Sequence, residues 1–298
     1  MLKVRKNASP SNRVGVASQY EGFGMDKQIL LINDMVEVGK LALSTMVPVL
    51  SYMGFPVSTL PTALVSNAFE YNKFNMLDTT SHMRESFKAW GELDFSFDAI
   101  ATGFMMSEEQ VDLINYFCSQ YDREEHYILV DPTMGDDGHL YSGLGGEMPR
   151  FMRKLIAVAS IAVPNYTEAC MLTKTPYVTD PISQREADGL VDKIRKLGAL
   201  SVSITSCVVE GKGDCVVGYD YLLDQRFCLP FERIPVDFPG TGDLFSAVLL
   251  GRLLQDQMLE SSTQSAMDAV YGMLDICKNQ NDPLRGIPVE QLLEVIDE

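Results

Sequence analysis

The chain has 298 residues, 46% of them hydrophobic, which is enough for one large α/β domain or two small ones. Its formal net charge of −17 argues against anionic partners, so neither nucleic acid nor an acidic membrane surface is expected to bind it. No stretch has the length of uncharged apolar chain that a membrane-spanning helix requires.

The N-terminal segment and the cysteines indicate the domain organisation and the cellular location of the protein. Residues 1–24 are polar and basic and lack the apolar core of a signal peptide, so we expect a mobile extension ahead of a single domain over residues 25–298. The six cysteines show no pair spacing, which is typical of reduced thiols in a cytoplasmic protein without a zinc site. The three histidines belong to no Ser-His-Asp or Cys-His arrangement, and hydrolase chemistry therefore has no support.

Apolar runs and helical periodicity alternate along the chain. Alternation of this kind predicts an α/β fold, with a parallel sheet covered by helices on both faces. A segment of alternating polarity late in the chain predicts an antiparallel pair over 214–219 and 221–229. The expected strands are 28–33, 55–60, 97–102, 127–130, a short one before Pro164, and 200–204, and the expected helices are 38–53, 79–90, one capped by Ser107, one ending before residue 163, 167–172, 183–197, 244–254, 262–278 and 289–296.

Polar residues or glycine follow five of the expected strands directly. In an open parallel sheet the ligand binds outside the carboxyl ends of the strands. The residues at these ends should therefore line a single binding edge; they are Asp34, Gly103, Asp131, Asn165 and Thr205.

A glycine-rich turn beginning at Phe238 precedes the most apolar predicted helix. Gly240 and Gly242 flank Thr241 and allow the backbone to approach a ligand closely. The free N–H groups at the start of the helix would bind an anion such as phosphate. Asp243 lies in the first turn, where a carboxylate can act as a base or serve only as a cap.

This turn, with Phe245 and Ala247 after it, resembles the signature of the ribokinase-type small-molecule kinases, and the chain is most similar to the pyridoxal kinases over about residues 29–270. The resemblance implies a ribokinase-like three-layer sandwich with a mostly parallel central sheet. It also implies ATP-dependent phosphorylation of the 5′-hydroxymethyl group of pyridoxal, pyridoxine or pyridoxamine, and a homodimer. Asp243 would be the base, and the anion hole would be formed by Gly240, Thr241 and Gly242.

Two further motifs have a plain structural interpretation and a functional one. The acidic turn Asp131–Gly138 can simply reverse the chain, whereas the resemblance implies that Asp131 lies near the ATP phosphates and that Asp136 binds Mg²⁺. Pro164-Asn165 is a helix start signal, whereas the resemblance implies that Asn165 and Glu168 hold Mg²⁺, mostly through water, beside the nucleotide.

The remaining nucleotide contacts are expected near the fifth strand and the glycine-rich turn. Thr205 and Ser206 end that strand, where hydroxyl groups can bind the nucleotide or merely satisfy the backbone of a turn. Phe238 opens the glycine-rich turn and is also predicted to bind ATP.

The residues expected to bind the substrate differ from the family pattern. The family sequence Ile-Gln-Ser-His is here Ile-Asn-Asp-Met, and the register places Asp34, Phe69, Glu70 and Phe104 against the substrate. Two aromatic rings favour a flat heteroaromatic compound. The charge of Asp34 favours a cationic ligand group, which predicts a preference for pyridoxamine over pyridoxal. Alternatively, Asp34 only caps the following helix.

Three other functions remain open. A hydroxymethylpyrimidine kinase of the same fold would share the Gly-x-Gly-Asp turn. A non-catalytic vitamer-binding or regulatory protein would have no need of Asp243 and Asp136. A sugar or nucleoside kinase is disfavoured because the early Gly-Gly substrate motif is missing.

Overall fold

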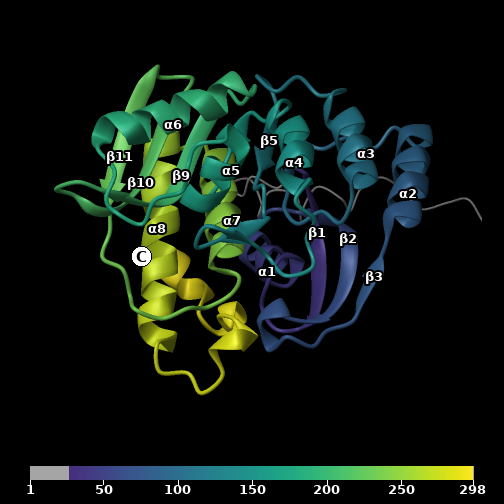
Figure 1. The fold of residues 1–298 in the computed structure, drawn as a ribbon. Coiled ribbons are helices and arrows are strands. Elements are labelled where there is room, and N and C mark those ends of the chain that lie inside the picture. The colour runs from purple at the N-terminus through teal and green to yellow at the C-terminus, as the bar shows by residue number, and fades with distance from the viewer. Residues whose placement is uncertain (1–26, 298) are drawn as a thin grey trace, which may run out of the picture.

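The computed structural model describes residues 27–297, so the predicted extension over residues 1–24 lies outside them. Nine strands form one sheet in the order β11-β10-β9-β8-β5-β4-β1-β2-β3, from left to right in Figure 1. The inner strands from β9 to β2 are parallel, and β10, β11 and β3 add antiparallel edges. The strands are β1 (Ile29–Val38), β2 (Val57–Asn67), β3 (Met76–Asp78), β4 (Ala99–Thr102), β5 (Tyr127–Val130), β8 (Ile161–Ala162), β9 (Ser201–Val209), β10 (Gly213–Asp220) and β11 (Gln225–Pro230), and a separate hairpin joins β6 (Gly135–Asp136) to β7 (His139–Leu140).

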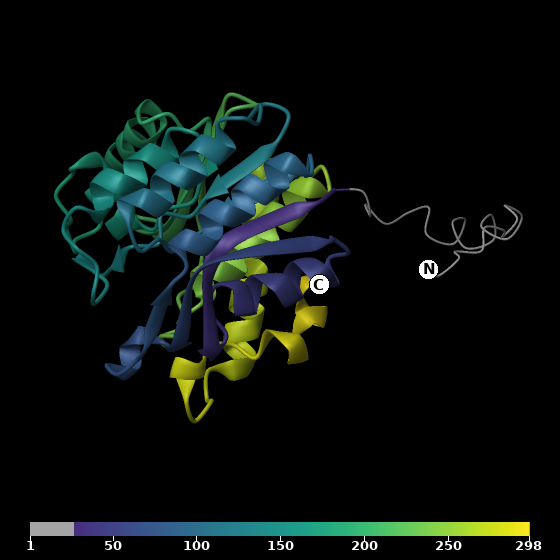
Figure 2. The same ribbon diagram turned by 90° about the vertical axis from the view of Figure 1, so that its right-hand side faces the viewer.

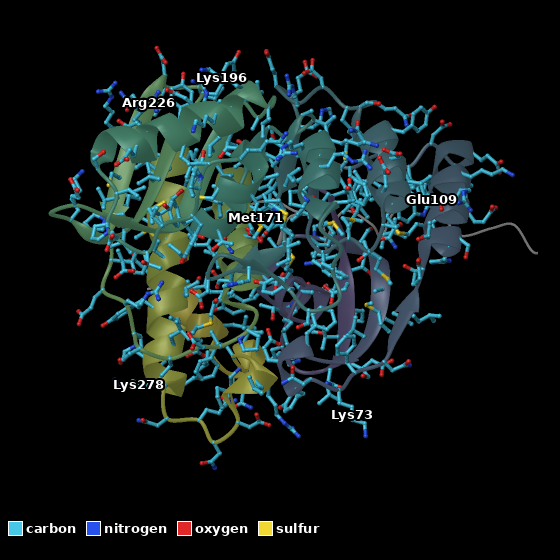
Figure 3. The ribbon with its side chains drawn as sticks, in the orientation of Figure 1. Lys73, Glu109, Met171, Lys196, Arg226 and Lys278 are labelled. Atoms are coloured by element: carbon cyan, nitrogen blue, oxygen red, sulfur yellow. The ribbon has the colours of Figure 1, made fainter. Side chains whose placement is uncertain are left out.

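Helices cover both faces of the sheet, as Figures 1 and 2 show, which confirms the predicted α/β three-layer architecture. Charged side chains such as Lys73, Lys196 and Lys278 project outward from these layers in Figure 3. One face carries α2 (Thr80–Glu92), α3 (Glu108–Cys118), α4 (Met148–Ile156), α5 (Tyr166–Thr173) and α6 (Gln184–Lys196), and the other carries α1 (Leu43–Tyr52), α7 (Thr241–Leu254) and α8 (Leu259–Cys277).

The central strand and helix α7 are apolar because both are enclosed by other elements. In β1, Leu30 and Ile32 pack into the core on the α2–α6 face, whereas Ile29 and Leu31 pack into the core on the other face. Side chains alternate between the two faces of a strand, and a strand covered on both faces therefore reads as a continuous apolar run. Helix α7 lies in the second core, which rigidly supports the turn at its N-terminus.

The first two strands are longer than predicted. We expected the first strand to end at Asn33 and the second at Leu60, but β1 reaches Val38 and β2 reaches Asn67. Pro61 is tolerated because the β1–β2 pairing is irregular next to its partner Asn33. The added half of β1 pairs with the added half of β2, which in turn pairs with β3, and Val36 is buried beside Val65 in a small third core.

Three predicted helices also need correction. Helix α1 starts at Leu43 rather than residue 38, because β1 occupies the earlier residues, and Pro48 lies inside it without ending it. Helix α5 begins at Tyr166 rather than residue 167, because Asn165 is its cap and the Asn165 side chain accepts a hydrogen bond from the Glu168 N–H. The segment predicted as a helix over 289–296 forms two 3₁₀ turns instead.

All six cysteines are free, as predicted. Among residues 27–297, no helix is long and apolar enough to cross a bilayer.

Candidate active site

The N-terminus of α7 is built as an open turn. Gly240 is the N-cap residue with φ of 87°, and a Cβ atom there would collide with the main-chain oxygen of Lys40, so this position requires glycine. The helical hydrogen bonds begin with the Leu244 N–H, which donates to the Gly240 oxygen over 3.0 Å. No side chain of residues 27–297 caps this helix, and its first N–H groups therefore remain available to an anion.

Two hydrogen bonds hold the Asp243 carboxylate. Its Oδ1 accepts from Asn33 Nδ2 over 3.0 Å, and its Oδ2 accepts from the Ala42 N–H over 2.8 Å. Ala42 adopts φ of 49°, a region that favours glycine, so the backbone is strained at the residue that presents this N–H. Burial raises the pKa of Asp243 to about 6, although both hydrogen bonds oppose the rise. Such a carboxylate can accept a proton near neutral pH.

Asn33 links Asp243 to two of the residues predicted to bind the substrate. This role was not predicted from the sequence. The Asn33 Oδ1 accepts from the N–H of Asp34 over 2.9 Å and from the N–H of Phe104 over 2.7 Å. A Cβ atom at Gly103 would collide with the Asn33 side chain, which explains the glycine at the end of β4. One signal in the sequence could have indicated this role, namely that Asn33 is a polar residue directly after a buried apolar run.

Asp131 faces the first turn of α7. Its carboxylate accepts from Thr133 Oγ1 and Ser246 Oγ, each over 3.0 Å. Burial, and then the charge of Asp243, raises the pKa of Asp131 to about 7. A Cβ atom on Gly242 would meet only Asp131 Oδ2, at 4.0 Å, so the space between the helix and this carboxylate is open.

Glu168 is occupied by main-chain groups. Its Oε1 accepts from the N–H of Met134 over 2.9 Å, and its Oε2 accepts from the N–H of Asn165 over 2.9 Å. Asn165 Nδ2 in turn donates to the Gly135 oxygen over 2.8 Å. Burial, and then the charge of Asp131, raises the pKa of Glu168 well above its ordinary value. The capping interpretation of this motif is therefore confirmed, and Glu168 also fixes the turn that carries Asp136.

The acidic residues fit a magnesium ion that would complete its coordination with phosphate and water. One oxygen of Asp136 accepts from the N–H of Asp137 over 2.9 Å, and the residue is exposed, so it can coordinate a cation. Within residues 27–297, no three acidic, histidine or cysteine side chains form a metal site alone. Tyr141, not singled out from the sequence, lies close enough to Glu168, Asp136 and Asp131 that their charges help to raise its pKa, after burial.

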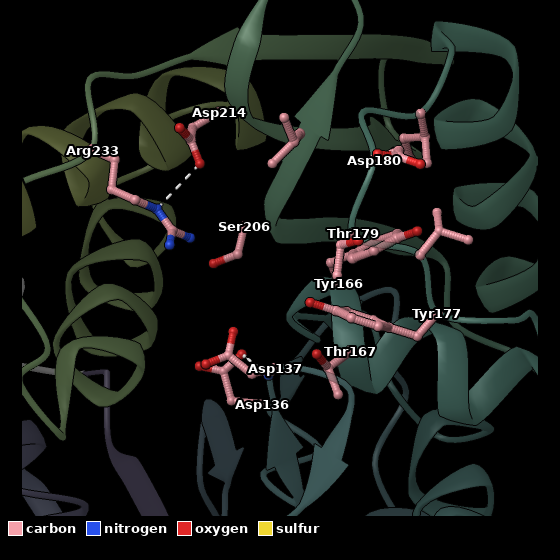
Figure 4. A pocket seen from close by; sticks show the side chains of 13 residues that line it. Asp136, Asp137, Tyr166, Thr167, Tyr177, Thr179, Asp180, Ser206, Asp214 and Arg233 are labelled. Carbon is pink, nitrogen blue, oxygen red and sulfur yellow. Dashed lines mark hydrogen bonds and ion pairs between the residues drawn. The ribbon is translucent and has the colours of Figure 1, made fainter. Parts of the chain in front are cut away.

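A cavity of about 320 Å³ opens beside this acidic turn (Figure 4). Its lining includes Asp136, Thr167 and Ser206. Within the described part of the chain, Arg233 is the one basic lining residue, and it pairs with Asp214 over 3.2 Å. Ser206 has φ of 59° at an irregularity in the β9–β10 pairing, and its side chain points into the cavity.

Thr205 and Phe238, which the sequence also predicts to bind the nucleotide, lie in different parts of the structure. Thr205 bridges to Asn165, since its N–H donates to the Pro164 oxygen over 3.0 Å. Phe238 is buried in the core with α7, so its contact with ATP stays a prediction.

The predicted substrate residues lie around the later half of β1. The rings of Phe69 and Phe104 are 5.6 Å apart, and Phe104 is buried. Asp34 is 6% exposed, and burial together with the charge of Asp243 raises its pKa to about 7. Glu70 lies in an exposed 3₁₀ turn, and its charge contributes to the raised pKa of Tyr141. The structure thus brings the predicted base and the predicted substrate residue Asp34 together.

Known proteins resemble the chain over most of its length. A model of the phosphomethylpyrimidine kinase family matches residues 49–284. The chain is 26% identical over 249 residues to a pyridoxine/pyridoxal/pyridoxamine kinase of Bordetella avium, covering 80% of this chain and 81% of that one. Its match to several other curated pyridoxal kinases covers about half of their length.

Two solved structures extend the comparison. A Bacteroides thetaiotaomicron protein described as a phosphomethylpyrimidine kinase, in a crystal form with pyridoxal, has a TM-score of 0.86 and 31% identity over 91% of this chain and 96% of that one. A pyridoxal kinase of Leishmania donovani in complex with ADP and ginkgotoxin has a TM-score of 0.79 and 20% identity over 92% and 96% of the two chains. The ribokinase-like fold and the resemblance to pyridoxal kinases are thereby confirmed.

Proposed function

We propose that this chain, which belongs to the phosphomethylpyrimidine kinase family, transfers the γ-phosphoryl group of ATP to the 5′-hydroxymethyl group of a vitamin B6 vitamer. The products would be the vitamer 5′-phosphate and ADP, in the salvage of pyridoxal 5′-phosphate. The observation that carries this proposal is Asp243, a half-buried carboxylate of near-neutral pKa at the uncapped N-terminus of α7.

Each part of the reaction has a candidate group. Asp243 would take the proton of the attacking hydroxymethyl group, and Asn33 and Ala42 would hold its two oxygens in place. The N–H groups of Thr241 and Gly242 would bind the phosphoryl oxygens. Because phosphoryl transfer requires little covalent chemistry, this positioning and charge stabilisation would supply most of the rate enhancement.

The nucleotide would lie along the edge that runs from Asp131 to the cavity in Figure 4. Thr205, Ser206 and Asn165 are proposed to bind it, and Asp136 would hold Mg²⁺ directly. The ion would neutralise charge on the phosphates. Glu168 would act on the metal through the turn that it fixes, since its oxygens already accept main-chain hydrogen bonds. The ADP complex of the Leishmania donovani enzyme supports a nucleotide site in this fold.

A hydroxymethylpyrimidine, or its phosphate, is the second candidate substrate, and the description of the matching family favours it. The Bacteroides thetaiotaomicron crystal form with pyridoxal favours a vitamer. ATP consumption measured against B6 vitamers, thiamine precursors and sugars would separate these possibilities. Turnover of a vitamer alone would support the proposal, whereas turnover of the pyrimidine alone would replace it. Binding of vitamers without any turnover would instead indicate a regulatory protein.

A further inference from the structure

Asp34 interrupts an apolar row on β1. Side chains alternate along a strand, so Ile32, Asp34 and Val36 share one face. The irregularity in the β1–β2 pairing places the extra residue in β2, because Asn33 pairs with Pro61 and Met35 with Leu64, and the alternation in β1 is therefore preserved. Ile32 packs into the core under the helices of that face, and Val36 packs beside Phe69. A carboxylate in this row lies among apolar neighbours.

Among residues 27–297, the Asp34 carboxylate has no partner for its charge. The residue is 6% exposed, and no other residue of 27–297 donates a hydrogen bond to its side chain. Burying a carboxylate without a partner is costly. The capping interpretation from the sequence is wrong, because α1 begins at Leu43 after Ala42 and has no side-chain cap. The structure of the protein alone therefore leaves this carboxylate free for a ligand.

The neighbours of Asp34 indicate which part of a ligand it would meet. The Asp34 N–H and Asp243 Oδ1 bind the two ends of the same Asn33 side chain, over 2.9 Å and 3.0 Å. The charge of Asp243 contributes to the raised pKa of Asp34, which confirms that the two carboxylates are close. The N–H of Phe104 donates to the same Asn33 oxygen, and the ring of Phe104 lies 5.6 Å from that of Phe69, so an aromatic pair is anchored to the residue that binds both aspartates.

We propose that Asp34 accepts a hydrogen bond from an amino group on the substituent next to the reactive hydroxymethyl group, which makes amino-bearing heteroaromatic alcohols the favoured substrates. This inference rests on the proposed function, because Asp243 must receive the hydroxymethyl proton for its neighbour Asp34 to meet the adjacent substituent. Pyridoxamine and 4-amino-5-hydroxymethyl-2-methylpyrimidine both present an amino group there. The aldehyde of pyridoxal cannot donate.

The test compares kcat/KM for pyridoxamine, pyridoxal and the aminopyrimidine in the wild type and in Asp34→Ser. A charge-assisted hydrogen bond predicts a preference of about 10- to 100-fold for an amine over pyridoxal. The Asp34→Ser variant should lose most of that preference. The control is Asp220→Ser, which removes another buried carboxylate, one that accepts from the N–H groups of Leu222 and Leu259 at the end of β10. This control should reduce stability and leave the preference unchanged.

Comparing the two amines shows which ring the site prefers. If pyridoxamine is the better substrate, the ring is a pyridine; if the aminopyrimidine is better, it is a pyrimidine. Equal use of pyridoxamine and pyridoxal, or a preference that survives in Asp34→Ser, overturns the inference and leaves the proposed kinase activity intact. If no heteroaromatic alcohol is phosphorylated, the proposed function fails, and calorimetric titration with pyridoxamine and pyridoxal then tests Asp34 directly. Equal affinities in that titration, or binding of neither compound, also overturn the inference.

Discussion

Replacement of Asn33 by leucine should damage both stability and activity. The change removes the donor to Asp243 Oδ1 and leaves the N–H groups of Asp34 and Phe104 without their acceptor. A buried polar group left unsatisfied costs about 1–3 kcal/mol, so two such groups should lower the free energy of unfolding by about 2–6 kcal/mol. At roughly 2–4 °C per kcal/mol, Tm should fall by at least about 4 °C.

Asn33→Asp separates the two roles of this residue. An aspartate keeps an acceptor for both N–H groups, but it cannot donate to Asp243 and places a like charge beside it. We therefore expect a smaller loss of Tm than in Asn33→Leu. The pKa of Asp243 should rise, because a like charge disfavours the ionised form, and the acidic limb of the kcat profile should move to higher pH.

Calorimetry and the pH profile of kcat are the assays for this prediction. Asn115→Leu is the control, since Asn115 Nδ2 donates a single bond, to the Lys154 oxygen over 2.8 Å, between α3 and α4. That variant should cost about 1 kcal/mol and leave the pH profile unchanged. If Asn33→Leu had the Tm and kcat of the wild type, the assigned role of Asn33 would be refuted.

Four further predictions follow from the same geometry. Gly242→Ala should fold normally and bind nucleotide more weakly, as measured by titration with ATP, whereas Gly240→Ala should lose stability because its Cβ would strike main chain. Asp136→Ala should raise the Mg²⁺ concentration for half-activity, and Glu168→Ala should do so while also lowering Tm; an unchanged titration in both would leave these residues as turn and cap only. The raised pKa of Asp34, about 7, means that its protonated form stabilises the fold, with a contribution present below pH 3.8 and lost as pH rises to about 7. Asp34→Asn should therefore gain Tm over the wild type at pH 8 more than at pH 4, and a constant difference would contradict this. A homodimer is expected from the family, and a sedimentation mass of one chain at micromolar concentration would disprove it.

The parts of the fold that local signals encode could be predicted from the sequence. The apolar run of Ile29–Ile32 indicated a buried central strand, and Gly240 and Gly242 ahead of an apolar run indicated the turn and α7. Strand–helix alternation then placed Asp131 and Asn165 at one edge of the sheet, because parallel strands end at the same edge.

The remainder depends on contacts between distant segments. Asn33 and Asp34 looked like the end of a strand, yet β1 continues because β2 pairs with it and a third core covers Val36. The bond from Asn33 to Asp243 joins residues 210 positions apart, so no local pattern could reveal it. Glu168 likewise accepts from Met134, which precedes it by 34 positions.

The most direct test of the proposed chemistry is single-turnover phosphoryl transfer to a vitamer in Asp243→Asn. We expect the rate to fall by roughly 10²–10⁴-fold, the range typical of a lost general base, with the Kd for ATP nearly unchanged. Asp268→Asn, an exposed change on α8, should behave as the wild type. Turnover at the wild-type rate in Asp243→Asn would contradict the assignment of the base.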